Sequence, residues 1–158
     1  MYSGIDNPSQ WVLSTALDEA AEATPGRVWV MTTDGEQLTF GSAADETRRS
    51  AGFFAHLGIR SGDRVAIMLP NWIEFIRVWL GLNRLGAVPV FINSELRGAF
   101  LKHQIAHSAL ETAVVHSQSL ASIVELDVGA SLRRIVCIGG DSGSGQTGVR
   151  RTFTMHGP

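Results

Sequence analysis

The sequence contains a single cysteine and lacks both a long apolar run and a basic leader. Cys137 cannot form an internal disulfide, and its place in the apolar run IVCIG favours a buried thiol over a reactive one. No stretch reaches the ~18 apolar residues of a membrane-spanning helix, and the opening MYSGIDNPSQW lacks the segments of a signal peptide. These absences predict a cytoplasmic protein without a membrane span.

Clusters of basic residues are missing as well. The 13 Lys and Arg against 15 Asp and Glu give a formal net charge of −2, so the sequence predicts no surface for nucleic acid or an anionic membrane. A length of 158 residues with 44% hydrophobic content fits one globular domain that can bury a core of its own.

The sequence does contain a regular alternation of apolar strands and helices. Asp34 and Gly35, between VWVMTT and QLTF, predict a hairpin, and Ser42 with Asp45 predicts a capping box at the next helix. From Arg64 onward, the alternation predicts an α/β fold with a mainly parallel sheet. The expected strands are GDRVAIML, VPVFI, TAVVH and RRIVCIG, and the expected helices lie near residues 9–22, 42–57, 71–85, 96–107 and 119–127.

The helix near residues 71–85 is apolar around most of its circumference. Four of its residues, Glu74, Arg77, Gly81 and Arg84, form one narrow polar stripe. Such a helix is expected to be nearly surrounded by protein. If its usual neighbours are absent, the chain exposes apolar surface, which predicts self-association.

The composition changes after Ile138. Six of the 17 glycines fall in the last 20 residues, where apolar residues are sparse and show no periodicity. We therefore expect a folded part over residues 1–138 and a Gly-rich, disordered tail over residues 139–158.

Several longer motifs resemble the AMP-forming adenylating enzymes, the superfamily that includes acyl-CoA ligases (AMP-dependent synthetases). The motifs are GIRSGDRVAIMLPNWIEF, GLNRLGAVPVFIN, and LRGAFLKHQIAHS before a strand, and they follow a hairpin that ends in LTF. The resemblance covers roughly residues 7–139. It implies that residues 1–138 are part of the amino-terminal α/β domain of such a ligase.

The resemblance also implies a reaction. In this family a carboxylic acid attacks ATP to give an acyl-adenylate and pyrophosphate, and coenzyme A then displaces AMP, as in fatty acid metabolism. A full-length relative uses ATP, Mg²⁺ and coenzyme A. We expect this chain to be a truncated ligase that lacks the remainder of the enzyme, holds none of these cofactors, and is inactive alone. The alternative is a small, non-catalytic α/β binding or scaffold domain.

The stretch GGDSGSGQTG, residues 139–148, resembles three phosphate-binding loops. The family's own loop reads approximately T-S-G-T-T-G-x-P-K, and the candidate cofactor-binding residues that match it are Ser144, Gly145, Thr147 and Gly148. Gln146 and Arg151 replace a threonine and the lysine, so a solvated linker is the favoured interpretation. A dinucleotide loop (Gly143, Gly145, Gly148) and a Walker loop (Gly140, Gly145, Thr147) would each have to open a helix.

Three further groups have a structural and a functional interpretation. His103 and His107 lie four apart, as in helical zinc sites, but no third ligand is evident, so surface histidines are favoured. The tryptophans at positions 29, 72 and 79 are expected in the core rather than in a cofactor stack. Arg133-Arg134 and Arg150-Arg151 are expected to be solvated charges. The sequence therefore assigns no catalytic residue and no metal ligand.

Overall fold

The computed structural model describes residues 12–126, 132–139 and 149–154. Its contacts divide the chain into two compact units. Unit 1 comprises residues 1–61 with 76–87, and unit 2 comprises residues 62–75 with 88–158. The boundary crosses helix α3 (Ile73–Arg84), so this helix contributes residues to both units.

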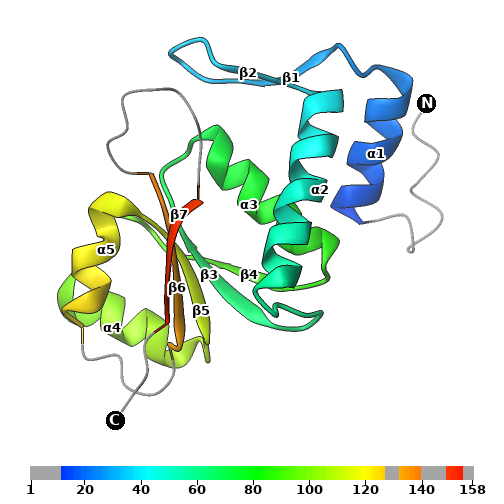
Figure 1. Ribbon diagram of the computed structural model, residues 1–158. Helices are drawn as coiled ribbons and strands as arrows, with labels where there is room; N and C mark the ends of the chain where they lie inside the picture. The colour runs from blue at the N-terminus through cyan, green and yellow to red at the C-terminus, as the bar shows by residue number, and fades with distance from the viewer. Residues whose placement is uncertain (1–11, 127–131, 140–148, 155–158) are drawn as a thin grey trace. The chain divides into compact units, whose positions relative to one another are not determined.

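Unit 1 contains two further helices and a hairpin (Figure 1). Helices α1 (Leu13–Ala23) and α2 (Phe40–His56) lie side by side. Strands β1 (Val28–Met31) and β2 (Gln37–Thr39) pair antiparallel, which confirms the predicted hairpin. Gly35 has a φ of 90° in the turn, a conformation that glycine adopts without a steric penalty.

The cap of α2 differs from the prediction. Thr39 is the N-cap: its side chain accepts from the backbone N–H of Ser42, and the Ser42 hydroxyl accepts from the N–H of Thr39. Ser42 is thus the N3 residue of the capping box and not the N-cap. Asp45 instead forms an ion pair with Arg48 at 3.0 Å. The helix begins where the hairpin ends, so the cap moves three residues toward the N-terminus.

Two arginines of α3 bind acidic residues within unit 1. The Arg84 guanidinium donates two hydrogen bonds to Asp18, at 2.8 and 2.7 Å, and a third to the Thr47 hydroxyl at 2.9 Å. These bonds, together with the charge of Arg84, hold the pKa of Asp18 below its ordinary value. Arg77 forms ion pairs with Glu46 and with Glu36. These two arginines are therefore partly buried and join α3 to α1, to α2 and to Glu36, which precedes β2.

Gly81 lies on the same stripe and sets the spacing between α3 and α2. A Cβ at position 81 would come within 2.3 Å of the Ser50 hydroxyl and 2.6 Å of its Cβ. Because real side chains do not approach this closely, glycine is required for the observed packing of these two helices.

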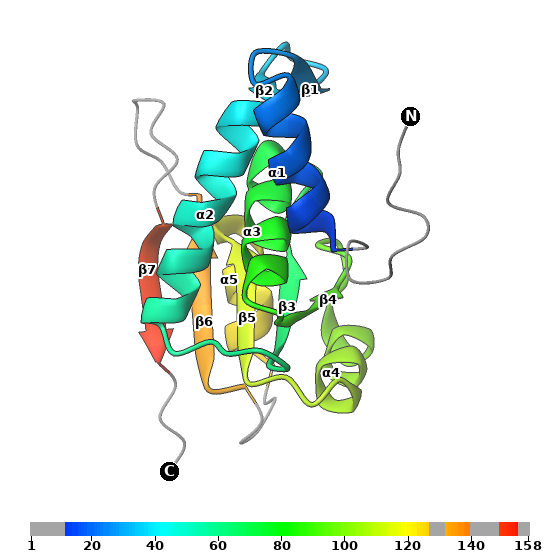
Figure 2. The ribbon, with the colours of Figure 1, turned by 90° about the vertical axis from the view of Figure 1, so that its right-hand side faces the viewer.

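Unit 2 is built on a five-stranded sheet. In Figure 2 the strands run in the order β4-β3-β5-β6-β7 across the sheet. The first four are parallel, and β7 pairs antiparallel with β6, which confirms the mainly parallel α/β prediction. The strand bounds are β3 (Arg64–Met68), β4 (Val88–Phe91), β5 (Thr112–His116), β6 (Arg134–Ile138) and β7 (Val149–Thr154).

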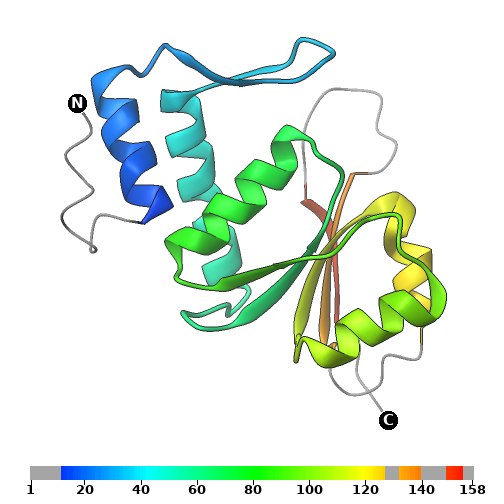
Figure 3. The same cartoon turned by 180° about the vertical axis from the view of Figure 1, so that it is seen from behind.

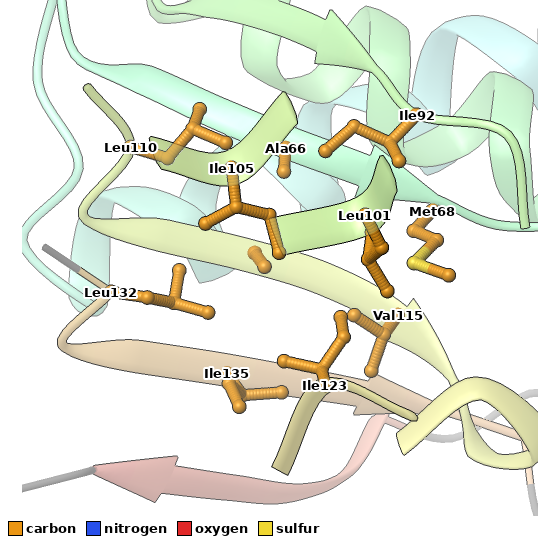
Figure 4. Packing of buried hydrophobic residues seen from close by; sticks show 11 residues of the cluster. Ala66, Met68, Ile92, Leu101, Ile105, Leu110, Val115, Ile123, Leu132 and Ile135 are labelled. Carbon is orange, nitrogen blue, oxygen red and sulfur yellow. The ribbon is translucent and has the colours of Figure 1, made fainter. Parts of the chain in front are cut away.

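Helices α4 (Gly98–His107) and α5 (Ser117–Val124) lie on one side of this sheet (Figure 3). Leu101 and Ile105 of α4 and Ile123 of α5 pack in one cluster with strand residues that include Val115 and Ile135 (Figure 4). All of them are at most 1% exposed. Cys137 of β6 is also buried, as predicted. Strands that are buried on both faces have continuous apolar sequences, which explains why they could be predicted from the sequence.

The structure differs from the sequence analysis at two further places. Strand β7 lies where no element was expected, while the rest of the tail from residue 140 lies outside the described residues. Trp29 and Trp72 are 39% and 48% exposed, so the prediction that they are core residues is wrong. Trp29 stacks on Phe40 with ring centroids 5.8 Å apart, and this contact covers one face of the indole.

Candidate functional site

The candidate site lies at the carboxyl-terminal edge of the parallel strands in unit 2. Parallel strands all end at the same edge, and ligands of open α/β sheets bind in the crevice where successive connections leave in opposite directions. The chain leaves β3 toward β4 on one side, and the next strand, β5, lies on the other side of β3. The crevice is therefore expected between the ends of β3 and β5.

Two side chains meet at this point. Trp72 follows β3, and His116 is the last residue of β5. Their rings make an edge-to-face contact with centroids 4.8 Å apart and an interplanar angle of 85°. About half of the Trp72 surface remains exposed, whereas His116 is buried. The exposed part of the indole thus forms an aromatic surface, and the contact with the buried imidazole holds the indole in place.

His116 is held in one orientation and one protonation state. Its Nδ1 accepts from the backbone N–H of Gln118 at 3.3 Å, which caps the first turn of α5. A nitrogen that accepts carries no proton, so the proton of the neutral ring is on Nε2. Burial lowers the pKa of His116 and so favours the neutral ring. The side chain can therefore donate one hydrogen bond from Nε2 and is unsuited to carry a positive charge.

Gly139 closes the site on the side of β6. Its φ is +83°, and a Cβ at this position would lie 2.6 Å from His116 Nε2. The backbone after β6 therefore packs directly on the imidazole edge, an approach that only glycine permits. Gly139 is also the first residue of the stretch 139–148 that carries the sequence-predicted phosphate residues.

On the side of β4 the edge is aromatic as well. Phe91, at the end of β4, is 53% exposed, and its ring centroid lies 5.3 Å from that of Phe75. The following turn is fixed because the Asn93 side chain accepts from the Glu95 N–H at 2.8 Å. Ser119 of α5 donates to the Ser94 carbonyl at 3.4 Å. The exposed Phe91 ring gives this end of β4 an apolar surface.

Two of the phosphate-loop interpretations meet an obstacle. Ser144, Gly145, Thr147 and Gly148, and with them Gly140, Gly143 and Gln146, lie outside the described residues. The element that follows them is strand β7, which begins at Val149. Dinucleotide and Walker loops both place phosphate at the N-terminus of a following helix, so neither interpretation fits.

The other sequence-predicted groups are placed as follows. His103 and His107 are both exposed on α4, with their rings 4.0 Å apart. Arg133 is 71% exposed at the side chain and lies 3.9 Å from Glu111, as expected of a solvated charge. Among the described residues, no three His, Cys, Asp or Glu side chains are grouped to hold a metal ion. None of the helices described could cross a membrane.

Sequence analysis missed His116, Trp72 and Gly139 as a group. Each follows or ends a predicted strand, and the carboxyl ends of parallel strands meet at one edge. A polar residue closing the run TAVVH is the signal that could have identified His116. Nothing in the sequence alone indicates that Trp72 would contact it.

Comparisons with known proteins agree on one family. The family model for the AMP-binding enzyme matches residues 17–149. The crotonobetaine/carnitine–CoA ligase of Salmonella typhi is 37% identical over 105 residues, which are 65% of this chain and 20% of that protein. The corresponding protein of Salmonella enteritidis is 48% identical over 62 residues, 39% of this chain and 12% of that one.

Solved structures give the same result. A long-chain-fatty-acid–CoA ligase from Archaeoglobus fulgidus matches with a TM-score of 0.76 and 25% identity, covering 84% of this chain and 28% of that one. MbtA of Mycobacterium smegmatis matches with a TM-score of 0.73 and 30% identity, covering 89% and 28%. The chain spans about a fifth of the length of the curated relatives it matches. It belongs to the family of AMP-binding enzymes, the AMP-forming ligases.

Proposed function

We propose that this chain supplies an amino-terminal α/β scaffold of an ATP-dependent acid–CoA ligase. The observation that carries the proposal is the family match over residues 17–149. The family reaction would convert a carboxylic acid, ATP and coenzyme A into an acyl-CoA, AMP and pyrophosphate. The named relatives are CoA ligases, which supports this reaction over a non-catalytic scaffold domain.

Within that reaction, the edge formed by Trp72, His116 and Gly139 would contribute one wall of a ligand pocket. The neutral imidazole supplies a hydrogen-bond donor, and the exposed indole supplies an apolar face. Both would act by binding and orienting, since the contacts found for the two rings within the described residues are with each other and with the backbone of Gln118. The edge therefore positions a ligand and does not react with it.

We further propose that these residues do not adenylate an acid by themselves. Adenylation requires charge stabilisation at phosphorus, which in this chemistry comes from Mg²⁺, a phosphate loop and a lysine. Within the part of the chain that the structure describes, no three His, Cys, Asp or Glu side chains are grouped to hold a metal ion by themselves. The single lysine of the chain, Lys102, is exposed on α4.

The test is acid-dependent exchange of labelled pyrophosphate into ATP with Mg²⁺ and a panel of short, medium and long-chain acids. The crotonobetaine/carnitine–CoA ligase of Salmonella typhi, with crotonobetaine, is the positive control. We expect exchange by the control and none by this chain. Exchange that disappears in Gly145→Val would overturn the proposal and identify a minimal ligase.

A second test separates a ligase from an independent scaffold. The DNA downstream of the codon for Pro158 can be translated in all three frames. A ligase ancestry predicts an apolar strand followed by a T-S-G-T-T-G-like loop in one frame. If all three frames lack such a loop, the independent scaffold domain is favoured.

A further inference from the structure

The two histidines of α4 are arranged as a pair that the proposed function does not use. Their rings lie 4.0 Å apart at an interplanar angle of 36°, and both side chains are exposed. On the same helix, Leu101 and Ile105 are buried in the core cluster of unit 2. Because the core holds these two residues, the helix presents His103 and His107 to solvent from a fixed backbone.

One ring is already oriented as a metal ligand requires. His107 Nδ1 lies 3.2 Å from the carbonyl oxygen of His103. A carbonyl oxygen can only accept, so Nδ1 carries a proton, and in the neutral ring the lone pair is then on Nε2. Histidines that bind metals commonly donate their other ring N–H to a backbone carbonyl in this way. The contact fixes the tautomer that leaves Nε2 free to coordinate.

The spacing of the rings suits a shared ion. With metal–nitrogen bonds of about 2.0–2.1 Å, two nitrogens bound at right-angled or tetrahedral positions lie about 2.9–3.4 Å apart. Because the ring centroids lie 4.0 Å apart, we infer that rotation of the His103 side chain brings one of its nitrogens to this distance from His107 Nε2, while the His107 contact is kept. Imidazole nitrogen is a ligand for zinc, copper and nickel, whereas Mg²⁺ prefers oxygen.

We propose that His103 and His107 form a two-ligand site for a divalent transition metal ion, with water in the remaining coordination positions. With two protein ligands, the site binds an exchangeable ion and does not resemble a closed structural zinc site. A bound ion links two successive turns of α4. It therefore stabilises the helix that carries Leu101 and Ile105 into the core.

The experiment is calorimetric titration of the untagged chain with Ni²⁺, followed by thermal unfolding with and without the ion. We expect one saturable Ni²⁺ site per chain and a rise in melting temperature, because an ion that binds the native state stabilises it. His103→Ala and His107→Ala should each weaken the binding by at least about tenfold, and the double variant should lose both effects.

We expect the alanine variants to fold, because alanine at an exposed helical position favours the helix and both histidine side chains lie outside the core. His56→Ala, at an exposed position of α2, is the matched control and should bind Ni²⁺ like the unchanged chain. Equal Ni²⁺ affinity in the unchanged chain and the double variant would overturn the proposal. So would the absence of saturable binding up to about 1 mM Ni²⁺.

Discussion

At the scale of single residues, Gly139 combines two constraints that can be separated. Its φ of +83° disfavours any side chain, and a Cβ would also collide with His116. Gly98 shares the first constraint, with a φ of +57°, but a Cβ added there would meet no atom within 4 Å. The two glycines are therefore a matched pair for measuring the contact at the candidate site.

We expect Gly98→Ala to lower the free energy of unfolding by about 1–2 kcal/mol, the cost of a left-handed alanine. Gly139→Ala should lower the free energy of unfolding by ~1–3 kcal/mol more than Gly98→Ala does, because the His116 imidazole must move to admit the new Cβ. Urea unfolding measures both. His116→Ala in the Gly139→Ala background should recover part of the difference. Equal losses in the two alanine variants would show that Gly139 does not constrain His116.

Asp18 provides a pH-dependent test in unit 1. Its pKa is lowered chiefly by the hydrogen bond from Arg84, so the unfolded state binds its proton more readily than the native state. The stabilisation is then complete above the ordinary pKa of 3.8 and is lost as pH falls through the lower native value.

Asp18→Asn should therefore lower the free energy of unfolding by about 1–3 kcal/mol at pH 7, and the difference from the unchanged chain should shrink below pH 4. Urea unfolding at several pH values measures this. The control is Asp45→Asn, whose carboxylate is 63% exposed and pairs with Arg48. An exposed pair contributes less than about 1 kcal/mol. A constant Asp18→Asn difference from pH 7 to pH 3 would contradict the prediction.

At the scale of elements, the packing of α2 against α3 depends on Gly81. Gly81→Ala should destabilise by about 1–3 kcal/mol, because its Cβ would overlap Ser50. Gly52, in α2, is exposed, and a Cβ added there would meet no atom within 4 Å, so Gly52→Ala should stabilise by about 0.5–1 kcal/mol. Thermal unfolding checks the opposite signs. Stabilisation by Gly81→Ala would show that the helices do not approach this closely.

Strand β4 is one of the two outer strands of the described sheet, and its sequence disfavours pairing with a further strand. Val88 and Ile92 donate their N–H groups to the carbonyls of Asp63 and Ile67. The direction of the N–H alternates along a strand, so an N–H at position 89 would point away from β3. That position is Pro89, which has no N–H. A proline at an edge strand discourages the addition of another strand. The edge of β4 is therefore protected from pairing through its backbone.

At the scale of the whole molecule, we expect self-association through apolar side chains. The exposed large hydrophobic residues among those described include Trp72, Phe91 and Val88 in unit 2 and Trp29 and Met31 in unit 1. Because Pro89 protects the β4 edge, association at that edge should proceed through side chains. Sedimentation velocity should show a mass that rises with concentration, and a hydrophobic dye should bind.

Phe91→Ser should reduce both the association and the dye signal, since it removes a ring that is 53% exposed. Arg133→Ser, at an exposed charged position, is the control and should leave both unchanged. A monodisperse monomer with a cooperative melt and no dye binding would contradict the prediction and favour a self-contained domain.

The parallel sheet, the hairpin and the family could all be predicted without a structure. The inner strands β3, β5 and β6 are largely buried on both faces, so each is a continuous apolar run such as TAVVH that local composition reveals. The hairpin follows from Asp34-Gly35, because the turn depends on backbone conformation alone. The family motifs are contiguous stretches of chain, so the sequence was sufficient to identify them.

Which residues meet could be known only from the packed fold. Trp72 and His116 are 44 positions apart in the sequence, and their contact depends on β3 and β5 being neighbours in the sheet. The pairing of Arg84 with Asp18 spans 66 positions and joins α3 to α1. The strand β7 was missed for the same reason, because its pairing with β6 is antiparallel and non-local. Periodicity reports the conformation of one segment, whereas these contacts arise from the packing of several.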